Sequence, residues 1–177
     1  MEVMQKNEKK YEQLEDPQTT ADILAITAIM VQDLTGKVRN GYEFNFERMT
    51  SFEGDTGPYL QYAHARLCSI ERKAQADIRS LSSADLSLLK EPHAIDLVRS
   101  LALYPEVIAN TLKTQEPSTL LTYLFKMSHA LSSSYDVLQV VGSEQEVKQA
   151  RLALYEAARQ VLWNGMTLLG LTPVERM

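Results

Sequence analysis

Residues 117–134, PSTLLTYLFKMSHALSSS, decide the fold class because their apolar side chains recur at helical spacing. Leucine or methionine stands at positions 120, 121, 124, 127 and 131, which lie on one side of a helix. Pro117 fits the first turn, where its missing N–H leaves no hydrogen bond unmade. Such a stripe must be buried against other elements, so it predicts one helix of a packed bundle.

Helical patterns also dominate the first half of the chain. Residues 2–15 are rich in charged, helix-forming residues and contain neither glycine nor proline. The pair Asp16–Pro17 predicts an N-cap and first residue for an amphipathic helix at 17–34. Asp55 predicts the cap of a second long helix, 55–80.

The second half predicts further helices of the same bundle. Pro92 opens one helix, and Pro105 kinks or restarts it before it ends near residue 114. Ser143 and Glu146 have the spacing of a capping box at the start of the last helix. Gly170 can end that helix in left-handed geometry, which leaves a short C-terminal tail.

Residues between the first two long helices have a different character. Tyr42, Phe44 and Phe46 alternate with polar residues, a pattern that predicts a short extended segment. We place the domain boundary after this segment. The sequence thus predicts an all-α fold, with an antiparallel helical bundle at 55–177 preceded by a short, mostly helical segment at 1–54.

Composition limits the classes of function. Hydrophobic residues make up 45% of the 177 residues, enough for a packed core, and no apolar run is long enough to span a bilayer. The net charge of −5 argues against non-specific binding of nucleic acid, which usually needs a basic excess. A single cysteine, Cys68, fits a reducing compartment. We therefore expect a cytoplasmic protein with neither a membrane nor DNA as partner.

Known catalytic and metal-binding patterns are missing from the sequence. His64, His93 and His129 fall on three different predicted helices, and none pairs with Cys68 at metal-ligand spacing. There is also no glycine-rich loop of the kind that cradles phosphates. We expect no metal, no cofactor and no active site within this chain.

One face of the last predicted helix is basic. Lys148, Arg151, Tyr155 and Arg159 stand at positions i, i+3, i+7 and i+11, so their side chains share that face. One interpretation is that the cations contact phosphates while Tyr155 stacks on a base or ribose. The other is a solvated charged face on a structural helix, which is common in bundles.

Tyr135 follows a run of three serines at the end of a predicted helix. Unpaired RNA bases are typically held by stacking on aromatic rings placed in this way. The alternative is a tyrosine that packs over the helix junction with its hydroxyl in water. The residues alone leave both interpretations open.

Several longer stretches resemble arginyl-tRNA synthetases. The most specific are SFEGDTGPYLQYAHARL at 51–67 and AARQVLWNGMTLLGLTPVERM at 157–177. Asp16–Pro17, ADILAITAIMVQDLTGK at 21–37 and NGYEF at 40–44 resemble the stretch that follows the catalytic signature loop in eukaryotic members. The resemblance covers nearly the whole chain.

The resemblance implies the C-terminal fragment of a class I enzyme. In this family an upstream Rossmann catalytic domain uses ATP with magnesium to attach arginine to its tRNA. The two ATP-binding signatures would precede residue 1, so the fragment alone is not expected to aminoacylate. Residues 1–54 would end the catalytic region, and residues 55–177 would form the anticodon-binding domain. The implied partners are arginine tRNA and the Rossmann domain of the same protein.

The same resemblance implies which residues contact RNA. In this family, aromatic residues of the bundle and the extreme C-terminus hold the splayed bases of the anticodon loop, and the central base is cytosine. The matching positions for direct base contact are Tyr62, Tyr135 and Met177. Secondary candidates near the same helix are Gln61, His64 and Arg66. The candidates for phosphates of the anticodon stem are Lys148, Arg151, Tyr155 and Arg159.

Two other functions remain as alternatives. A helical protein-interaction module would share the bundle pattern but would show no preference among tRNAs. A self-contained enzyme is disfavoured because the sequence contains no catalytic constellation. Titration with arginine tRNA separates these hypotheses.

Overall fold

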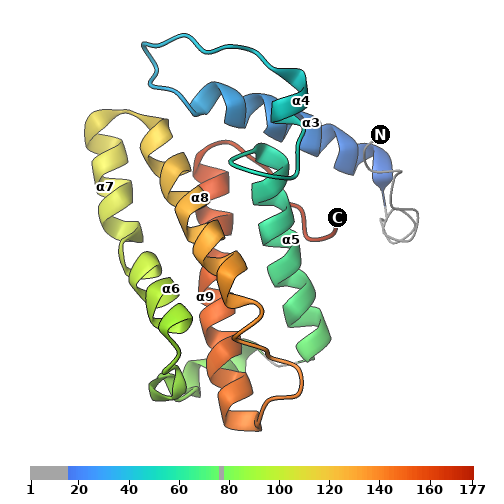
Figure 1. The fold of residues 1–177 in the computed structure, drawn as a ribbon, viewed down its shortest axis with the longest axis vertical. Coiled ribbons are helices and arrows are strands. Elements are labelled where there is room, and N and C mark those ends of the chain that lie inside the picture. Colours follow the sequence, from blue (N-terminus) through green and yellow to red (C-terminus); the bar gives the residue numbers. More distant parts are fainter. Residues whose placement is uncertain (1–15, 76–77) are drawn as a thin grey trace.

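The computed structural model describes residues 16–75 and 78–177. The helix predicted at 2–15 lies outside the described residues. Within them, long helices stand side by side, and α3 lies across their upper end (Figure 1). The described residues contain helices and no strand, which confirms the predicted all-α fold.

The helices follow one another along the chain with short connections. They are α3 (Pro17–Leu34), α4 (Phe46–Met49), α5 (Gly57–Ala74), the 3-10 turns η1 (Ile78–Ser83) and η2 (Leu86–Leu88), α6 (Pro92–Ala102), α7 (Tyr104–Thr114), α8 (Pro117–Ser134) and α9 (Gln145–Leu168). Pro105 lies in the first turn of α7, so it restarts the helix, as predicted.

The core lies where α5, α6 and α9 pack around α8. All five residues of the predicted stripe on α8 are buried: Leu120, Leu121, Leu124, Met127 and Leu131. A Cβ atom at Gly165 of α9 would lie 2.6 Å from a methyl carbon of Leu124. This glycine therefore allows α8 and α9 to approach closely in the centre of the bundle.

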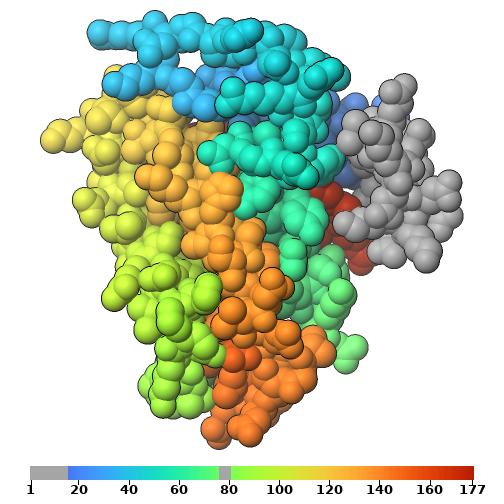
Figure 2. All heavy atoms as spheres, in the orientation of Figure 1, coloured from blue at the N-terminus to red at the C-terminus, as the bar shows by residue number. Residues whose placement is uncertain are grey.

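The segment that precedes the bundle, here called the lead segment (described from residue 16 to 54), packs on the bundle through α3. A Cβ atom at Gly57 would lie 2.6 Å from the carbonyl oxygen of Thr27, so only glycine fits between α3 and α5. Thr27 itself is buried. In Figure 2, the cyan segment that follows α3 covers the upper end of the bundle.

Two predicted helix boundaries are wrong at α5. The side chain of Thr56, not Asp55, caps the helix by accepting the N–H of Tyr59. The helix ends at Ala74 rather than near residue 80, because Gln75 adopts a left-handed φ of 49°. Left-handed geometry is uncommon for a residue other than glycine, so the sequence carried no signal for this end.

The predicted capping box of the last helix is also wrong. Ser143 donates to the carbonyl of Gln139 instead, and Glu144 occupies the N-cap without a side-chain bond. The other end agrees with the prediction: Gly170 has a φ of 79°, and Leu171 N donates to Met166 O at 2.9 Å. This closure turns the chain into the C-terminal tail.

The segment predicted to be extended contains one helical turn. Asn45 accepts the N–H of Arg48 and caps α4, so Phe46 belongs to a helix. Tyr42, Phe44 and Phe46 are all exposed. No helix in the described part of the chain is long and apolar enough to cross a membrane.

Candidate functional site

Three of the predicted RNA-contacting residues form one cluster between α5 and the end of α8. Tyr62 and Arg66 lie one turn apart on α5, and Tyr135 is the C-cap of α8. The Arg66 guanidinium lies 4.0 Å from the centre of the Tyr135 ring, a distance typical of a cation–π contact. Arg66 Nη1 also donates to the Tyr62 hydroxyl at 3.4 Å. Arg66 therefore bridges the two tyrosines.

A groove of about 340 Å³ opens beside this cluster. Among the described residues that line it are two cations, Arg66 and Lys73, and no carboxylate. Val140 and Val141 contribute apolar surface from the loop after α8. In Figure 2 the orange surface of α8 and this loop adjoins the green surface of α5. A groove with cations and apolar walls suits a base with its phosphate.

The hydroxyl of Tyr135 is the most unusual polar group of this groove. It is buried and has no hydrogen-bond partner. Burial raises the pKa of Tyr135 far above its usual range, so the hydroxyl keeps its proton and remains a donor. A buried donor without an acceptor costs about 1–3 kcal/mol. The hydroxyl has almost no exposed surface, so an acceptor on a ligand reaches it only when the side chains that cover it move aside.

A second pair of rings continues the aromatic surface toward the start of α5. Tyr59 and His129 are stacked with their ring centres 5.2 Å apart. His129 Nε2 lies 2.7 Å from a carboxylate oxygen of Asp55, which ties α8 to the loop before α5. Sequence reasoning missed this pair. The available signal was that Tyr59 precedes Tyr62 by three residues and so shares its side of α5.

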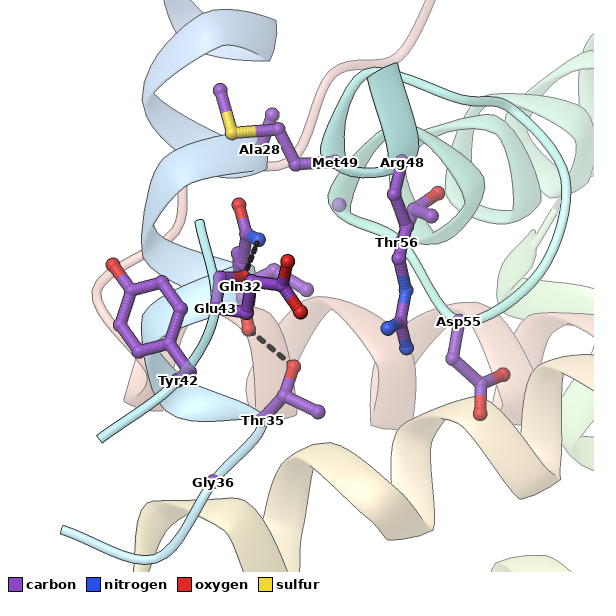
Figure 3. A pocket seen from close by; sticks show the side chains of 12 residues that line it. Ala28, Gln32, Thr35, Gly36, Tyr42, Glu43, Arg48, Met49, Asp55 and Thr56 are labelled. Carbon is purple, nitrogen blue, oxygen red and sulfur yellow. Dashed lines mark hydrogen bonds between the residues drawn. The ribbon is translucent and has the colours of Figure 1, made fainter. Parts of the chain in front are cut away.

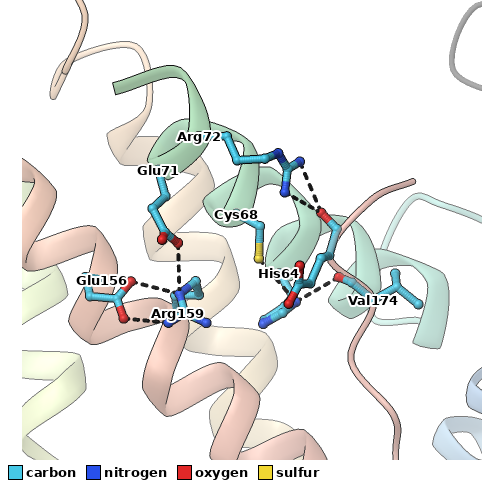
Figure 4. Close-up of polar contacts among 8 residues, drawn as sticks. His64, Cys68, Glu71, Arg72, Glu156, Arg159 and Val174 are labelled. Atoms are coloured by element: carbon cyan, nitrogen blue, oxygen red, sulfur yellow. Dashed lines mark hydrogen bonds and ion pairs between the residues drawn. The ribbon is translucent and has the colours of Figure 1, made fainter. Parts of the chain in front are cut away.

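Gln61 and His64 do not face the groove. Both side chains are fully buried, and both are hydrogen-bonded to the backbone of the C-terminal tail. Figure 4 shows the His64 ring turned toward Val174 on the tail. Direct contact with RNA would require both side chains to leave the core, so the structure replaces that prediction with a role in holding the tail.

The tail that carries Met177 is attached to α5 by other residues than Tyr62 and Arg66. The tail that ends in Met177 is bonded to Gln61, His64 and Arg72, including the carbonyl of Glu175. Successive helical residues are about 100° apart, so Gln61 and His64 are turned by more than a right angle from Tyr62 and Arg66 around α5. The aromatic groove and the tail therefore flank α5 on different sides.

The basic residues of α9 have partners within the protein. Lys148 donates to the carbonyl of Ala74, Arg151 pairs with Glu91, and Arg159 pairs with Glu156 and Glu71 (Figure 4). The hydrogen bond from Arg151 holds the pKa of Glu91 below its usual range. The interpretation of this face as a free phosphate-binding surface is therefore corrected: its charges stabilise contacts between helices.

Tyr155 is likewise part of the core. It is only 3% exposed, and its hydroxyl lies 3.2 Å from both Ser134 Oγ and the carbonyl oxygen of Leu138. Its ring centre lies 5.7 Å from that of Tyr135. The predicted contact of Tyr155 with RNA is replaced by a packing role beneath Tyr135.

A separate pocket of about 220 Å³ lies between α3 and residues 42–57. Figure 3 shows Gln32 and Glu43 on one side of it, and Arg48 and Asp55 on the other. Gln32 Nε2 donates to the carbonyl of Glu43 at 3.1 Å. Within residues 16–75 and 78–177, no three His, Cys, Asp or Glu residues are grouped to hold a metal ion.

Comparisons with known proteins identify the family of the helical bundle. The DALR anticodon binding domain model matches residues 60–177. The cytoplasmic arginine–tRNA ligase of Saccharomyces cerevisiae is 61% identical over 99% of this chain and 29% of its own length. The mitochondrial arginine–tRNA ligase of the same yeast is 50% identical over 100% and 28%.

A solved structure has the same fold over nearly the whole chain. The arginyl-tRNA synthetase of Thermus thermophilus superimposes with a TM-score of 0.90 at 28% identity, over 99% of this chain and 30% of that one. The chain spans less than a third of the length of each of these proteins. The match to the domain model covers most of the bundle, and the chain belongs to the DALR anticodon-binding domain family.

Proposed function

We propose that this chain binds the anticodon loop of arginine tRNA as part of an arginine–tRNA ligase. The observation that carries the proposal is the groove beside Tyr135, whose ring lies under the Arg66 guanidinium and whose buried hydroxyl has no hydrogen-bond partner. Single-stranded RNA bases are held by stacking on such rings, and their polar edges supply hydrogen-bond acceptors. A cytosine offers both O2 and N3 to a phenolic donor.

Tyr62, which lies beside the groove, and the groove's own polar and aromatic residues have distinct tasks in this proposal. Tyr62 and Tyr135 stack on unpaired bases, which contributes about 1–3 kcal/mol per base. Arg66 and Lys73 contact the phosphates, which positions the loop without selecting its sequence. The Tyr135 hydroxyl supplies selectivity, because a base without an acceptor at that point leaves the donor unsatisfied.

The whole protein would carry the chemistry that this chain lacks. We propose that an upstream Rossmann domain binds ATP with magnesium, arginine and the acceptor end of the tRNA. Residues 1–54 would connect that domain to the anticodon-binding domain at 55–177. The exposed rings of Phe44 and Phe46, 61% and 65% accessible, suit a contact with such a neighbouring domain. Higher identity to the cytoplasmic yeast ligase than to the mitochondrial one, 61% against 50%, favours a cytoplasmic enzyme.

A fluorescence titration with two RNAs tests the proposed function. One is an arginine tRNA transcript, and the other is the same transcript with its central anticodon cytosine replaced by adenine. We expect the replacement to weaken binding about tenfold or more, since one base contact contributes about 1–3 kcal/mol. Equal affinity for the two transcripts would remove anticodon recognition and favour a protein-interaction module.

A further inference from the structure

The C-terminal tail is held by a side-chain amide that takes the place of a neighbouring strand. Gln61 Nε2 donates to Thr172 O, and Gln61 Oε1 accepts from Val174 N, both at 2.9 Å. The tail thus makes two backbone bonds to one amide, as an extended chain does to its partner in a sheet. Because Thr172 O can only accept and Val174 N can only donate, the orientation of the Gln61 amide is fixed.

Two further side chains of α5 extend this attachment along the tail. His64 Nδ1 lies 2.8 Å from Val174 O, and since a carbonyl only accepts, this nitrogen carries the proton. Burial lowers the pKa of His64, which keeps the ring neutral. Arg72 donates two bonds of 3.2 Å to Glu175 O. All of these bonds reach main-chain atoms of the tail, and the buried side chains of Leu171 and Val174 add apolar packing to them.

Gln61 is also bonded to the lead segment. Its Nε2 donates a second bond, at 2.9 Å, to Thr27 Oγ1 of α3. The Gln61 side chain has no exposed surface, and both amide hydrogens and the amide oxygen have partners. Such a fully satisfied buried amide has one low-energy arrangement, which makes it a precise anchor.

We propose that Gln61 is a positioning residue for RNA binding, which acts by fixing the path of residues 172–175 and thereby the place of Met177. This inference rests on the proposed function and adds to it a contact between Met177 and the anticodon loop, which the resemblance to arginyl-tRNA synthetases implies. Gln61 itself touches no RNA. Its contribution to affinity passes entirely through the tail.

Three variants separate this role from a general loss of packing. Gln61→Leu removes the bonds to the tail and to Thr27, whereas Thr27→Val removes only the bond to α3. A deletion of residues 176–177 removes the proposed RNA contact and leaves the bonded part of the tail. Each variant, and Gln61→Leu combined with the deletion, is titrated with arginine tRNA at one fixed salt concentration.

We expect Gln61→Leu and the deletion each to weaken binding about tenfold, and the combination to weaken it no further. Thr27→Val should stay within about twofold of the unmodified chain, because both tail bonds remain. Additive losses in the combination, or an equally large loss in Thr27→Val, would overturn the role of Gln61. If the unmodified chain fails to distinguish arginine tRNA from its anticodon variant, the proposed function fails instead, before any variant is compared.

Hydrogen exchange distinguishes a local release of the tail from unfolding of the variant. In Gln61→Leu, the amide of Val174 should exchange faster while the central amides of α8 and α9 keep their protection. If those helices also lose protection, Arg72→Gln is used in place of Gln61→Leu. The Arg72 side chain is exposed, so its replacement frees Glu175 O without disturbing the core. Its loss of affinity should likewise disappear in the deletion background, and persistence there would contradict the inference.

Discussion

The groove between α5 and α8 and the basic face of α9 both resemble RNA-binding surfaces in the sequence, but they differ in how their polar groups are used. On α9, Lys148, Arg151 and Arg159 each bond to another part of the protein. In the groove, the Tyr135 hydroxyl is buried and without a partner. Arg151 Nε is also buried without a partner, but the other guanidinium nitrogens of Arg151 are bonded within the protein, whereas the Tyr135 side chain has its single polar group unpaired.

The largest loss of stability should follow from disrupting the ion pair between Arg151 of α9 and Glu91. Replacing Arg151 with methionine removes its pair with Glu91 and its bond to the carbonyl of Gln139. The pair is only partly exposed, so we expect the free energy of unfolding to fall by about 2 kcal/mol. Chemical denaturation measures this loss. Affinity for arginine tRNA, measured below the unfolding transition, should stay the same. A parallel loss of affinity would show that this face of α9 contacts the RNA.

A smaller loss of stability should follow from Tyr155→Phe. The Tyr155 hydroxyl lies 3.2 Å from both Ser134 Oγ and Leu138 O, so its removal leaves a buried carbonyl short of a donor. We expect a loss of about 1 kcal/mol in the free energy of unfolding, without a change in RNA affinity. A weakened RNA complex at unchanged stability would restore the predicted contact between Tyr155 and RNA.

The salt dependence of binding should separate the cations of the two surfaces. Lys73 lines the groove, whereas Lys148 donates to the carbonyl of Ala74. Lys73→Gln should weaken binding a few-fold and reduce the slope of log affinity against log salt by about one, because one phosphate contact is lost. Lys148→Gln is the matched control and should leave the slope unchanged. Equal slopes for the two variants would remove Lys73 from the interface.

The smallest effect concerns pH. The hydrogen bond from Arg151 lowers the pKa of Glu91 below its usual 4.5, so the ionised carboxylate favours the folded state. The stabilisation is present above pH 4.5 and disappears as the pH falls through the lower, folded-state pKa. The difference in unfolding free energy between the unmodified chain and Glu91→Gln should therefore shrink below pH 4.5. A constant difference across this range would contradict the assigned pair.

Local sequence patterns predicted much of the fold. The stripe on α8 and the cap at Asp16 depend only on residues within a few positions of each other, and the structure confirms both. The end of α5 depends on the left-handed geometry of Gln75, which the sequence does not signal. Short-range patterns therefore located helices more reliably than they located helix ends.

The candidate site depended on contacts between distant residues. Glu91, which neutralises Arg151, precedes it by 60 residues, so the spacing along α9 gave no sign that the charge was already paired. Arg66 and Tyr135 are even farther apart in the sequence, and only the resemblance to a family placed them in one interface. Burial of Gln61, His64 and Tyr155 followed from tertiary packing, which no pattern of spacing on one helix reveals.

Substitution of Tyr135 by phenylalanine tests the central claim most directly. The change removes the unpartnered hydroxyl and keeps the ring under Arg66. We predict that affinity for arginine tRNA falls about five- to tenfold, while the free energy of unfolding stays the same or rises slightly. If Tyr135→Phe leaves the affinity for arginine tRNA unchanged, the Tyr135 hydroxyl does not contribute to RNA binding.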